Sequence, residues 1–247
     1  AKIIVVDPRV IETARIADIH LQIKNGSNLA FLNAMANVII KEGLHDKEFI
    51  DAHTEGFDEW LEVVERYTPE YSAEICGVEA DAIREAARMY ATAETSILGW
   101  GMGVTQQRQG VHTVHAIASL ACVAGQIARP HCGVAPVRGQ NNVQGSCDMG
   151  MWPSLYPGYQ KVTDPEIREK FAKAWNLPPE RLSLKEGLKL TDLPHGVKEK
   201  KIRAFYNFGE DPLQTEPDSA DMKKTLEDID FLISQDIFMT QTTAMAD

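Results

Sequence analysis

The residues with the clearest chemical potential stand in the run 138–150, Arg-Gly-Gln-Asn-Asn-Val-Gln-Gly-Ser-Cys-Asp-Met-Gly, which holds one guanidinium, four carboxamides and three glycines. A guanidinium offers a planar pair of donors that matches a carboxylate or a phosphate. A carboxamide donates and accepts at once, which suits the edge of a purine or a pterin. Glycines let the backbone approach a flat ligand. These residue types therefore predict a loop that holds a polar heterocycle beside a small anion.

A run rich in Gly, Asn and Gln is also typical of a solvated surface turn. Two features favour a binding loop over a turn. The run follows the apolar, small-residue segment 116–125, which predicts a buried helix, and it contains neither Lys nor Glu.

The run resembles a segment of the catalytic (alpha) subunit of molybdenum- or tungsten-dependent formate dehydrogenases, which are molybdopterin-guanine-dinucleotide oxidoreductases. The similarity extends over nearly all of the 247 residues, and further similar segments stand in the family's order at 5–9, 100–106, 209–214 and 235–240. The resemblance implies oxidation of formate to CO2 at a Mo or W centre held by two molybdopterin guanine dinucleotides. It also implies a 4Fe-4S cluster that passes the two electrons onward.

The resemblance also implies roles for particular residues. Arg138 would bind the carboxylate of formate and orient its C–H bond, and Gly139 and Gln140 would touch the pterin. The other cofactor-binding residues would be Asp7, Arg9, Gly26 and Asn28 around one guanosine, Gly101, Met102, Gly103 and Gln106 at a pterin–phosphate portion, and Gly209, Asp211, Gln235, Asp236 and Thr240 around the guanosine half of the second cofactor.

Several of these residues have a plainer interpretation. Asp7 could simply end a strand, Met102 could fill the core, and Thr240 could cap a turn. Arg9 could form a surface ion pair, and Arg138 an ion pair between domains. Asn28 departs from the family pattern, because the wider family often has an aspartate at this position.

The elements that must position these residues predict an α/β architecture. Strands are expected at 2–6, 18–23, 96–98, 202–208 and 229–234, and helices at 28–43, 79–93, 111–127, 164–175 and 218–227, with short helices from about 47, 58 and 69. Segments 100–103, 138–150, 152–159 and 177–198 are expected to be loops or irregular. The alternation favours largely parallel sheets. Polar groups follow four of the predicted strands, where open α/β sheets bind ligands, so a dinucleotide is indicated.

The resemblance implies parts of two Rossmann-like parallel-sheet domains of the formate dehydrogenase and DMSO reductase architecture. A first cofactor-binding domain is expected over residues 1–140 and a second over residues 141–247, both partial. The chain begins on a strand without an initiator Met and stops after a strand and a polar loop. We therefore expect an internal fragment that is inactive alone. Its metal ligand, its cluster cysteines and its electron-transfer partner subunits would lie outside it.

Charge and cysteine content narrow the possibilities. The net charge of −11 argues against nucleic acid as a partner, and no apolar run reaches the roughly 18 residues of a membrane span. The four cysteines form no Cys-x-x-Cys pair, so no metal site is expected within the chain, and their low number fits a cytoplasmic location. His112 and His115 are assigned to a helix face, because a zinc-protease helix needs histidines at i, i+4 with a glutamate.

Two other functions remain open from the sequence. The first is another molybdopterin oxidoreductase, such as a nitrate reductase. The second is a non-catalytic module that binds nucleotides or protein partners.

Overall fold

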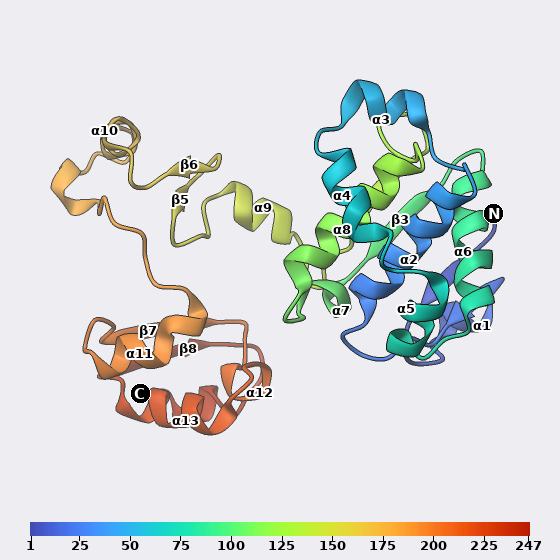
Figure 1. The fold of residues 1–247 in the computed structure, drawn as a ribbon. Helices are drawn as coiled ribbons and strands as arrows, with labels where there is room; N and C mark the ends of the chain where they lie inside the picture. The colour runs from blue at the N-terminus through green and yellow to red at the C-terminus, as the bar shows by residue number, and fades with distance from the viewer. The chain divides into compact units, whose positions relative to one another are not determined.

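A computed structural model describes residues 1–247, and the chain divides into two compact units, Ala1–Asn141 and Asn142–Asp247 (Figure 1). Each unit has its own hydrophobic core. The predicted α/β fold class is confirmed, since helices alternate with strands and three of the four two-stranded sheets are parallel. The assignment of one cofactor-binding domain to residues 1–140 and another to 141–247 stays a prediction.

The first unit contains two parallel strand pairs. Strand β1 (Ile4–Val6) pairs with β2 (Ile19–Leu21), and β3 (Ile97–Trp100) pairs with β4 (Gly133–Pro136). Parallel strands end at the same edge, so the loops that follow β1 and β2 lie together, as do those that follow β3 and β4. This arrangement brings together polar segments that are far apart in the sequence.

Helices form most of the first unit's core. They are α1 (Glu12–Arg15), α2 (Asn28–Lys41), α3 (Lys47–His53), α4 (Phe57–Val64), α5 (Pro69–Cys76), α6 (Ala80–Thr92), α7 (Met102–Thr105) and α8 (Gly110–Val123). Helix α2 is buried on all sides over residues 30–39 and packs against α5, α6 and α8. The apolar face predicted for the helix at 79–93 is confirmed, because Ile83, Ala86, Ala87 and Tyr90 of α6 are all buried.

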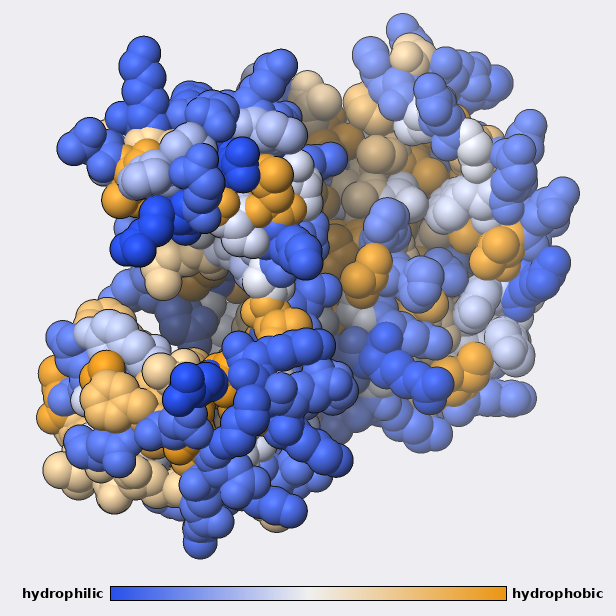
Figure 2. Space-filling view, turned by 90° about the vertical axis from the view of Figure 1, so that its left-hand side faces the viewer, coloured by the Kyte–Doolittle hydropathy of each residue, from blue (hydrophilic) through white to orange (hydrophobic).

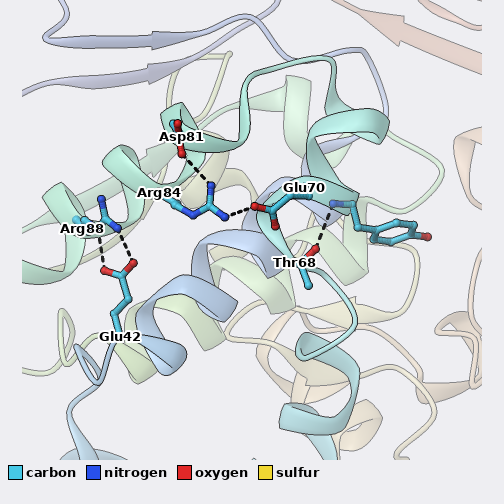
Figure 3. A network of polar contacts seen from close by, with 7 residues as sticks. Glu42, Thr68, Glu70, Asp81, Arg84 and Arg88 are labelled. Atoms are coloured by element: carbon cyan, nitrogen blue, oxygen red, sulfur yellow. Dashed lines mark hydrogen bonds and ion pairs between the residues drawn. The ribbon is translucent and has the colours of Figure 1, made fainter.

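Two predicted helix starts are confirmed by their capping hydrogen bonds. The hydroxyl of Thr68 accepts from the backbone N–H of Tyr71 at 3.2 Å, and Pro69 opens α5 (Figure 3). In the second unit, Asp164 Oδ1 accepts backbone N–H donors ahead of a helix that begins at Pro165. Each cap satisfies donors that the first turn of a helix leaves free.

Ion pairs on the surface join α6 to its neighbours. The guanidinium of Arg84 contacts both Glu70 of α5 and Asp81 of α6, and Arg88 binds both carboxylate oxygens of Glu42 at 2.7 Å just beyond α2 (Figure 3). The side-chain hydrogen bonds from these arginines hold the pKa of Glu70 and of Glu42 below the ordinary glutamate value. The pairs therefore hold α6 against α2 and α5 as long as both carboxyls stay ionised.

The second unit begins with α9 (Val143–Asp148), a short antiparallel hairpin of β5 (Leu155–Tyr156) and β6 (Gln160–Lys161), and α10 (Pro165–Ala174). Next come the 3-10 turns η1 (Pro179–Arg181) and η2 (Leu190–Asp192), then α11 (Leu193–Lys198). The remaining elements are β7 (Ala204–Phe208), α12 (Pro212–Thr215), α13 (Ser219–Asp228), β8 (Phe231–Gln235) and η3 (Thr243–Met245). The predicted βαβ unit is confirmed, because β7 and β8 are parallel over five residue pairs with α13 between them.

The strand β4 was not predicted from the sequence. Three of its four residues, Gly133, Ala135 and Pro136, are disfavoured in strands. The segment is extended because it pairs with β3, more than 30 residues earlier in the chain. The helix predicted at 111–127 was too long, since α8 ends at Val123 and Gly125 then adopts a left-handed φ of +62°. A helix cannot continue through that conformation.

Three segments predicted to be loops contain helices. Segment 100–103 leads into α7, the run 138–150 contains α9, and segment 177–198 contains α11. Helix α9 starts at Val143 and is capped by Asn142, whose side chain accepts from the backbone N–H of Gly145 at 3.2 Å. None of the three helices exceeds six residues, so none shows the apolar periodicity that reveals a helix in a sequence.

One face of the β7–β8 sheet is apolar and exposed. Leu232 packs with α11 and α13, whereas Tyr206, Phe208, Phe231 and Ile233 point to the opposite face and are exposed. On the side of the molecule drawn in Figure 2, hydrophobic residues are scattered over a surface that is mostly hydrophilic. The structure contains no helix whose length and apolar character would let it cross a lipid bilayer.

Candidate functional site

Asp7 and Arg9 follow β1 in a tight turn. Asp7 Oδ1 accepts from the backbone N–H of Arg9 at 2.7 Å, and the backbone oxygen of Asp7 lies 3.0 Å from His20 Nε2. Asp7 therefore stabilises the turn that ends β1, as its plainer interpretation predicts, and its second carboxylate oxygen forms no hydrogen bond. Arg9 is exposed and makes no ion pair, so the surface ion pair considered for it is not formed.

Gly26 and Asn28 follow β2 at the same edge of the sheet. Gly26 has a left-handed φ of +81°, and a methyl group added there would meet nothing within 4 Å. Asn28 is the first residue of α2. Ser27 does not cap this helix with its side chain, because its hydroxyl donates to the backbone oxygen of Lys24 at 2.6 Å. The first backbone N–H groups of α2 therefore have no side-chain cap, and the nearby backbone of Gly26 is open to close approach.

The β3–β4 pairing brings the 101–106 segment beside Arg138. Trp100 stands opposite Pro136 in the register, and the backbone N–H of Val137 donates to the oxygen of Trp100 at 2.7 Å. A Cβ built on Gly101 would lie 3.9 Å from the backbone oxygen of Val137. Segments that are about 35 residues apart in the chain therefore leave the sheet side by side.

Most of the 101–106 segment faces outward, whereas Val104 packs against the core of the unit. Met102, the first residue of α7, is 43% exposed, so its interpretation as a core residue is wrong. Gly103 has open space where a Cβ would stand. Gln106 is exposed. The segment presents one flexible thioether, one carboxamide and bare backbone, which is a suitable surface for a flat polar ligand.

Arg138, Gly139 and Gln140 are exposed beyond β4. The guanidinium of Arg138 forms no ion pair and no side-chain hydrogen bond in its unit, and Gly139 has open space at its Cβ position. Five N–H donors of one side chain are therefore free for an anion.

The carboxyl ends of β7 and β8 carry the candidate residues of the second unit. The backbone N–H of Gly209 donates to the oxygen of Gln235 at 2.9 Å, so the two segments are adjacent. The side-chain oxygen of Gln235 accepts from the hydroxyl of Tyr206 on the neighbouring strand. Gly209 has a φ of +65° and open space around it.

Asp211 is bound within the unit. Its Oδ1 accepts from both the backbone N–H and the hydroxyl of Thr242, at 3.1 and 2.6 Å. Thr242 is fully buried, and its hydroxyl in turn accepts from the backbone N–H of Leu213. Sequence reasoning missed Thr242, because the pairing joins residues 31 positions apart. Asp211 therefore has a structural role as well as a free second oxygen.

Asp236 and Thr240 both stabilise turns after β8. Asp236 Oδ1 accepts from the backbone N–H of Phe238 at 2.8 Å. The hydroxyl of Thr240 accepts from the backbone N–H of Thr243 at 3.0 Å, which is the capping role considered for it. The two residues shape the loop that would meet a ligand at this edge.

Gln144 and Asp148, two polar residues of the 138–150 run, form hydrogen bonds with Tyr159, which lies outside the run. Asp148 Oδ1 accepts from the hydroxyl of Tyr159 and from Gln144 Nε2. These hydrogen bonds lower the pKa of Asp148, and the carboxylate raises the pKa of Tyr159. Tyr159 had no predicted role, and no local pattern in the sequence links it to the run.

The remaining titratable residues show no metal-binding arrangement. No group of three or more His, Cys, Asp or Glu is placed to hold a metal ion, and all four cysteines are free thiols. Burial raises the pKa of the Cys76 and Cys122 thiols. His112 and His115 are both exposed on α8.

Comparison with known proteins identifies the family of this chain. The sequence profile of the family described as molybdopterin oxidoreductase matches residues 1–247, so the chain belongs to that family. Within it, the chain is 56% identical over its full length to formate dehydrogenase H of Escherichia coli and 47% identical to the F420-dependent formate dehydrogenase subunit alpha of Methanocaldococcus jannaschii. It covers 34% and 36% of these proteins, so it spans about a third of their length.

A solved structure supports the fold. Acetylene hydratase from Pelobacter acetylenicus matches 99% of this chain and 36% of its own, with a TM-score of 0.73 and 27% identity. The family resemblance seen in the sequence is thereby confirmed, and membership supports a molybdopterin cofactor.

Proposed function

We propose that this chain is the central, cofactor-binding part of the catalytic subunit of a formate dehydrogenase, which oxidises formate to CO2. The observation that carries the proposal is the 56% identity with formate dehydrogenase H across all 247 residues. The free guanidinium of Arg138 beside the 101–106 segment supports it, because formate is a small planar anion that such a group binds through two hydrogen bonds.

The proposed cofactor is a pair of molybdopterin guanine dinucleotides that hold Mo or W, and it would supply the two-electron redox chemistry. The strand-end loops fit such a ligand, since a Cβ at Gly26, Gly103, Gly139 or Gly209 would meet nothing within 4 Å and the backbone there is open to close approach. The residues proposed to hold it are Asp7, Arg9, Gly26, Asn28, Gly101, Met102, Gly103, Gln106, Gly139 and Gln140 in the first unit, and Gly209, Asp211, Gln235, Asp236 and Thr240 in the second.

Arg138 is proposed to hold the formate carboxylate and so to fix the direction of the C–H bond. A charge-assisted hydrogen bond contributes about 1.5–3 kcal/mol to holding an anion. Holding the anion in one orientation also raises the rate of the reaction itself, because fewer encounters are unproductive. Arg138 thus binds and orients formate without taking a proton or an electron.

Substitution of Arg138 in the full-length enzyme tests the proposal. We expect Arg138→Ala to raise the formate KM roughly 10- to 100-fold, in line with the loss of a charge-assisted pair. Arg138→Lys should fall between Arg138→Ala and the wild type, since it keeps the charge and loses the planar fork. Steady-state dye reduction with formate as the electron donor measures both.

Arg66→Ala is the matched control, because Arg66 is exposed in the same unit and forms no side-chain hydrogen bond or ion pair. Unchanged formate kinetics in Arg138→Ala would refute the substrate role. Nitrate reduction without formate oxidation by the wild type would favour the nitrate reductase alternative.

The wider assembly is also a proposal. We expect the remainder of the subunit to supply the metal ligand and a 4Fe-4S cluster, and separate subunits to accept the electrons. A cytoplasmic location is proposed because all four cysteines are free thiols, as is usual in a reducing compartment.

A further inference from the structure

We propose that His20 and Gln22 are positioning residues for the turn of Asp7, Pro8 and Arg9, whose backbone they hold in place for cofactor binding. The proposal rests on the proposed function, in which Asp7 and Arg9 hold one guanosine of the cofactor. All five residues belong to the first unit.

Strand β2 and the residues just after it have one buried side and one open side. Ile19, Leu21 and Ile23 are buried in the core of the unit, whereas His20 is half-buried and Gln22 is exposed. Because successive side chains of an extended chain point to opposite sides, His20 and Gln22 leave the chain on the same side. Packing of the core therefore does not account for either side chain.

Both side chains donate to the backbone of the turn that follows β1. His20 Nε2 lies 3.0 Å from the backbone oxygen of Asp7, and this ring nitrogen carries the proton because a carbonyl oxygen only accepts. Gln22 Nε2 donates to the backbone oxygen of Pro8 at 3.1 Å. Two successive carbonyl groups of the turn are therefore held by side chains that stand 13 and 14 positions later in the chain.

The rest of the backbone of the turn is hydrogen-bonded as well. The N–H of Asp7 donates to the backbone oxygen of Leu21 at 3.2 Å, and the N–H of Arg9 donates to Asp7 Oδ1 at 2.7 Å. The backbone oxygen of Arg9 accepts from the N–H of Ile11 at 2.9 Å, and Pro8 has no N–H. With the two side-chain bonds, every backbone polar group of the turn has a partner.

The groups that this arrangement leaves free are the ones proposed to meet the cofactor. The second carboxylate oxygen of Asp7 forms no hydrogen bond, and the guanidinium of Arg9 is exposed and unpaired. A turn held in one conformation presents both side chains to a ligand with less loss of conformational entropy. Removal of His20 or Gln22 leaves a carbonyl group without its partner and lets the turn move.

The test uses the full-length enzyme with the variants Gln22→Glu and His20→Ala. Gln22→Glu keeps the size of an exposed side chain and replaces its donor by a carboxylate, which repels the Pro8 oxygen. In both variants we expect faster amide hydrogen exchange over residues 7–11. We also expect acid hydrolysis of the purified protein to release roughly 2- to 10-fold less GMP, as the loss of one hydrogen bond allows.

The kinetic constants should respond differently from one another. We expect kcat per subunit to fall by the same factor as the GMP content, because fewer subunits carry the cofactor. The formate KM should stay unchanged, because formate is proposed to be held by Arg138 and not by this turn.

His20→Gln is the conservative variant, because its amide nitrogen reaches about as far as Nε2 and still donates, and we expect wild-type exchange and GMP content. His112→Ala and Gln109→Glu are the matched controls, since both residues are exposed in the same unit and neither side chain forms a hydrogen bond.

Unchanged exchange over residues 7–11 in both variants would overturn the hold on the turn. Faster exchange with an unchanged GMP content, a raised formate KM, or a His20→Gln variant that behaves like His20→Ala would overturn the positioning role alone, provided that the wild type releases GMP and oxidises formate. A wild type that releases no GMP would overturn the proposed function and the positioning role with it.

Discussion

The polar side chains of the strand-end loops differ in how many hydrogen bonds they already form within the protein. Asp211 gives one oxygen to the buried Thr242, and Asp7 and Asp236 give one oxygen each to a turn. Arg9 and Arg138 give nothing to their unit. A carboxylate held in this way is already oriented. Less side-chain conformational entropy is therefore lost when a ligand binds its second oxygen. The free guanidiniums are the groups whose direction a ligand must still set.

The contact between Asp211 and Thr242 leads to a test of stability at the residue scale. Asp211→Ala removes the only acceptor for the backbone N–H and hydroxyl of Thr242, which is fully buried. An unsatisfied buried donor costs about 1–3 kcal/mol, and two donors lose their acceptor here, so we expect the free energy of unfolding to fall by about 2–6 kcal/mol. Chemical denaturation followed by circular dichroism measures the change.

Asp228→Ala is the control for this substitution, because Asp228 is exposed and its side chain forms no hydrogen bond. Equal stability of the two variants would contradict the structural role of Asp211.

At the scale of elements, the segments proposed to bind the cofactor are attached to regular secondary structure. The 101–106 segment becomes the helix α7, and the run 138–150 is divided between an open link and the helix α9. Helix α9 then packs on the β5–β6 hairpin through Gly150. Loops with such supports hold a site more precisely than free loops do.

The packing of Gly150 gives a prediction at this scale. Gly150→Ala should lower the free energy of unfolding by more than Gly209→Ala. Both glycines have a left-handed φ, +81° and +65°, so both substitutions carry the same backbone strain. Only at Gly150 does the new Cβ also meet backbone atoms, 2.6 Å from Pro157 and 2.7 Å from Tyr156, which cannot move aside cheaply. Denaturant titration of both variants measures the difference, and equal losses would show that α9 and the hairpin do not pack as described.

At the scale of the whole molecule, surface ion pairs stabilise a fold that the large negative net charge destabilises. The formal net charge is −11, and self-repulsion of this kind weakens a folded state. Six carboxyls nevertheless have a pKa lowered by hydrogen bonds from neighbouring side chains, mostly Lys and Arg: Asp18, Glu42, Glu70, Asp148, Glu199 and Asp230. These pairs stabilise the fold only while the carboxyls are ionised.

The sign of the pH dependence follows from these shifts. A carboxyl whose pKa is lower in the folded state contributes stability above its unfolded value, about 3.9 for Asp and 4.3 for Glu, and loses it as the pH falls through the folded value. We expect the Tm to decline below about pH 4.5. Thermal melts between pH 7 and pH 3 measure the decline.

Glu42→Gln should reduce the acid-side decline and lower the Tm at neutral pH, because it removes one of the paired carboxyls. A Tm that keeps rising down to pH 3 would show that relief of the negative charge outweighs the loss of the pairs.

The sequence by itself determined the elements that carry local signals. The caps at Thr68 and Asp164, the apolar face of α6 and the βαβ unit ending at β8 were all predicted correctly. Local signals suffice there because capping and periodicity depend on residues a few positions apart. The family, too, followed from ordered short motifs that a linear sequence displays directly.

The tertiary structure alone decided the contacts between distant residues. The strand β4 exists because β3 pairs with it, and the contacts of Asp211 with Thr242 and of Tyr159 with Asp148 close gaps of 31 and 11 residues. No local preference encodes such pairings, because each forms only after the intervening chain has folded and its loop entropy has been lost. The residue types of the 138–150 run could therefore be read from the sequence, whereas the formation of α9 within the run was decided by the tertiary structure.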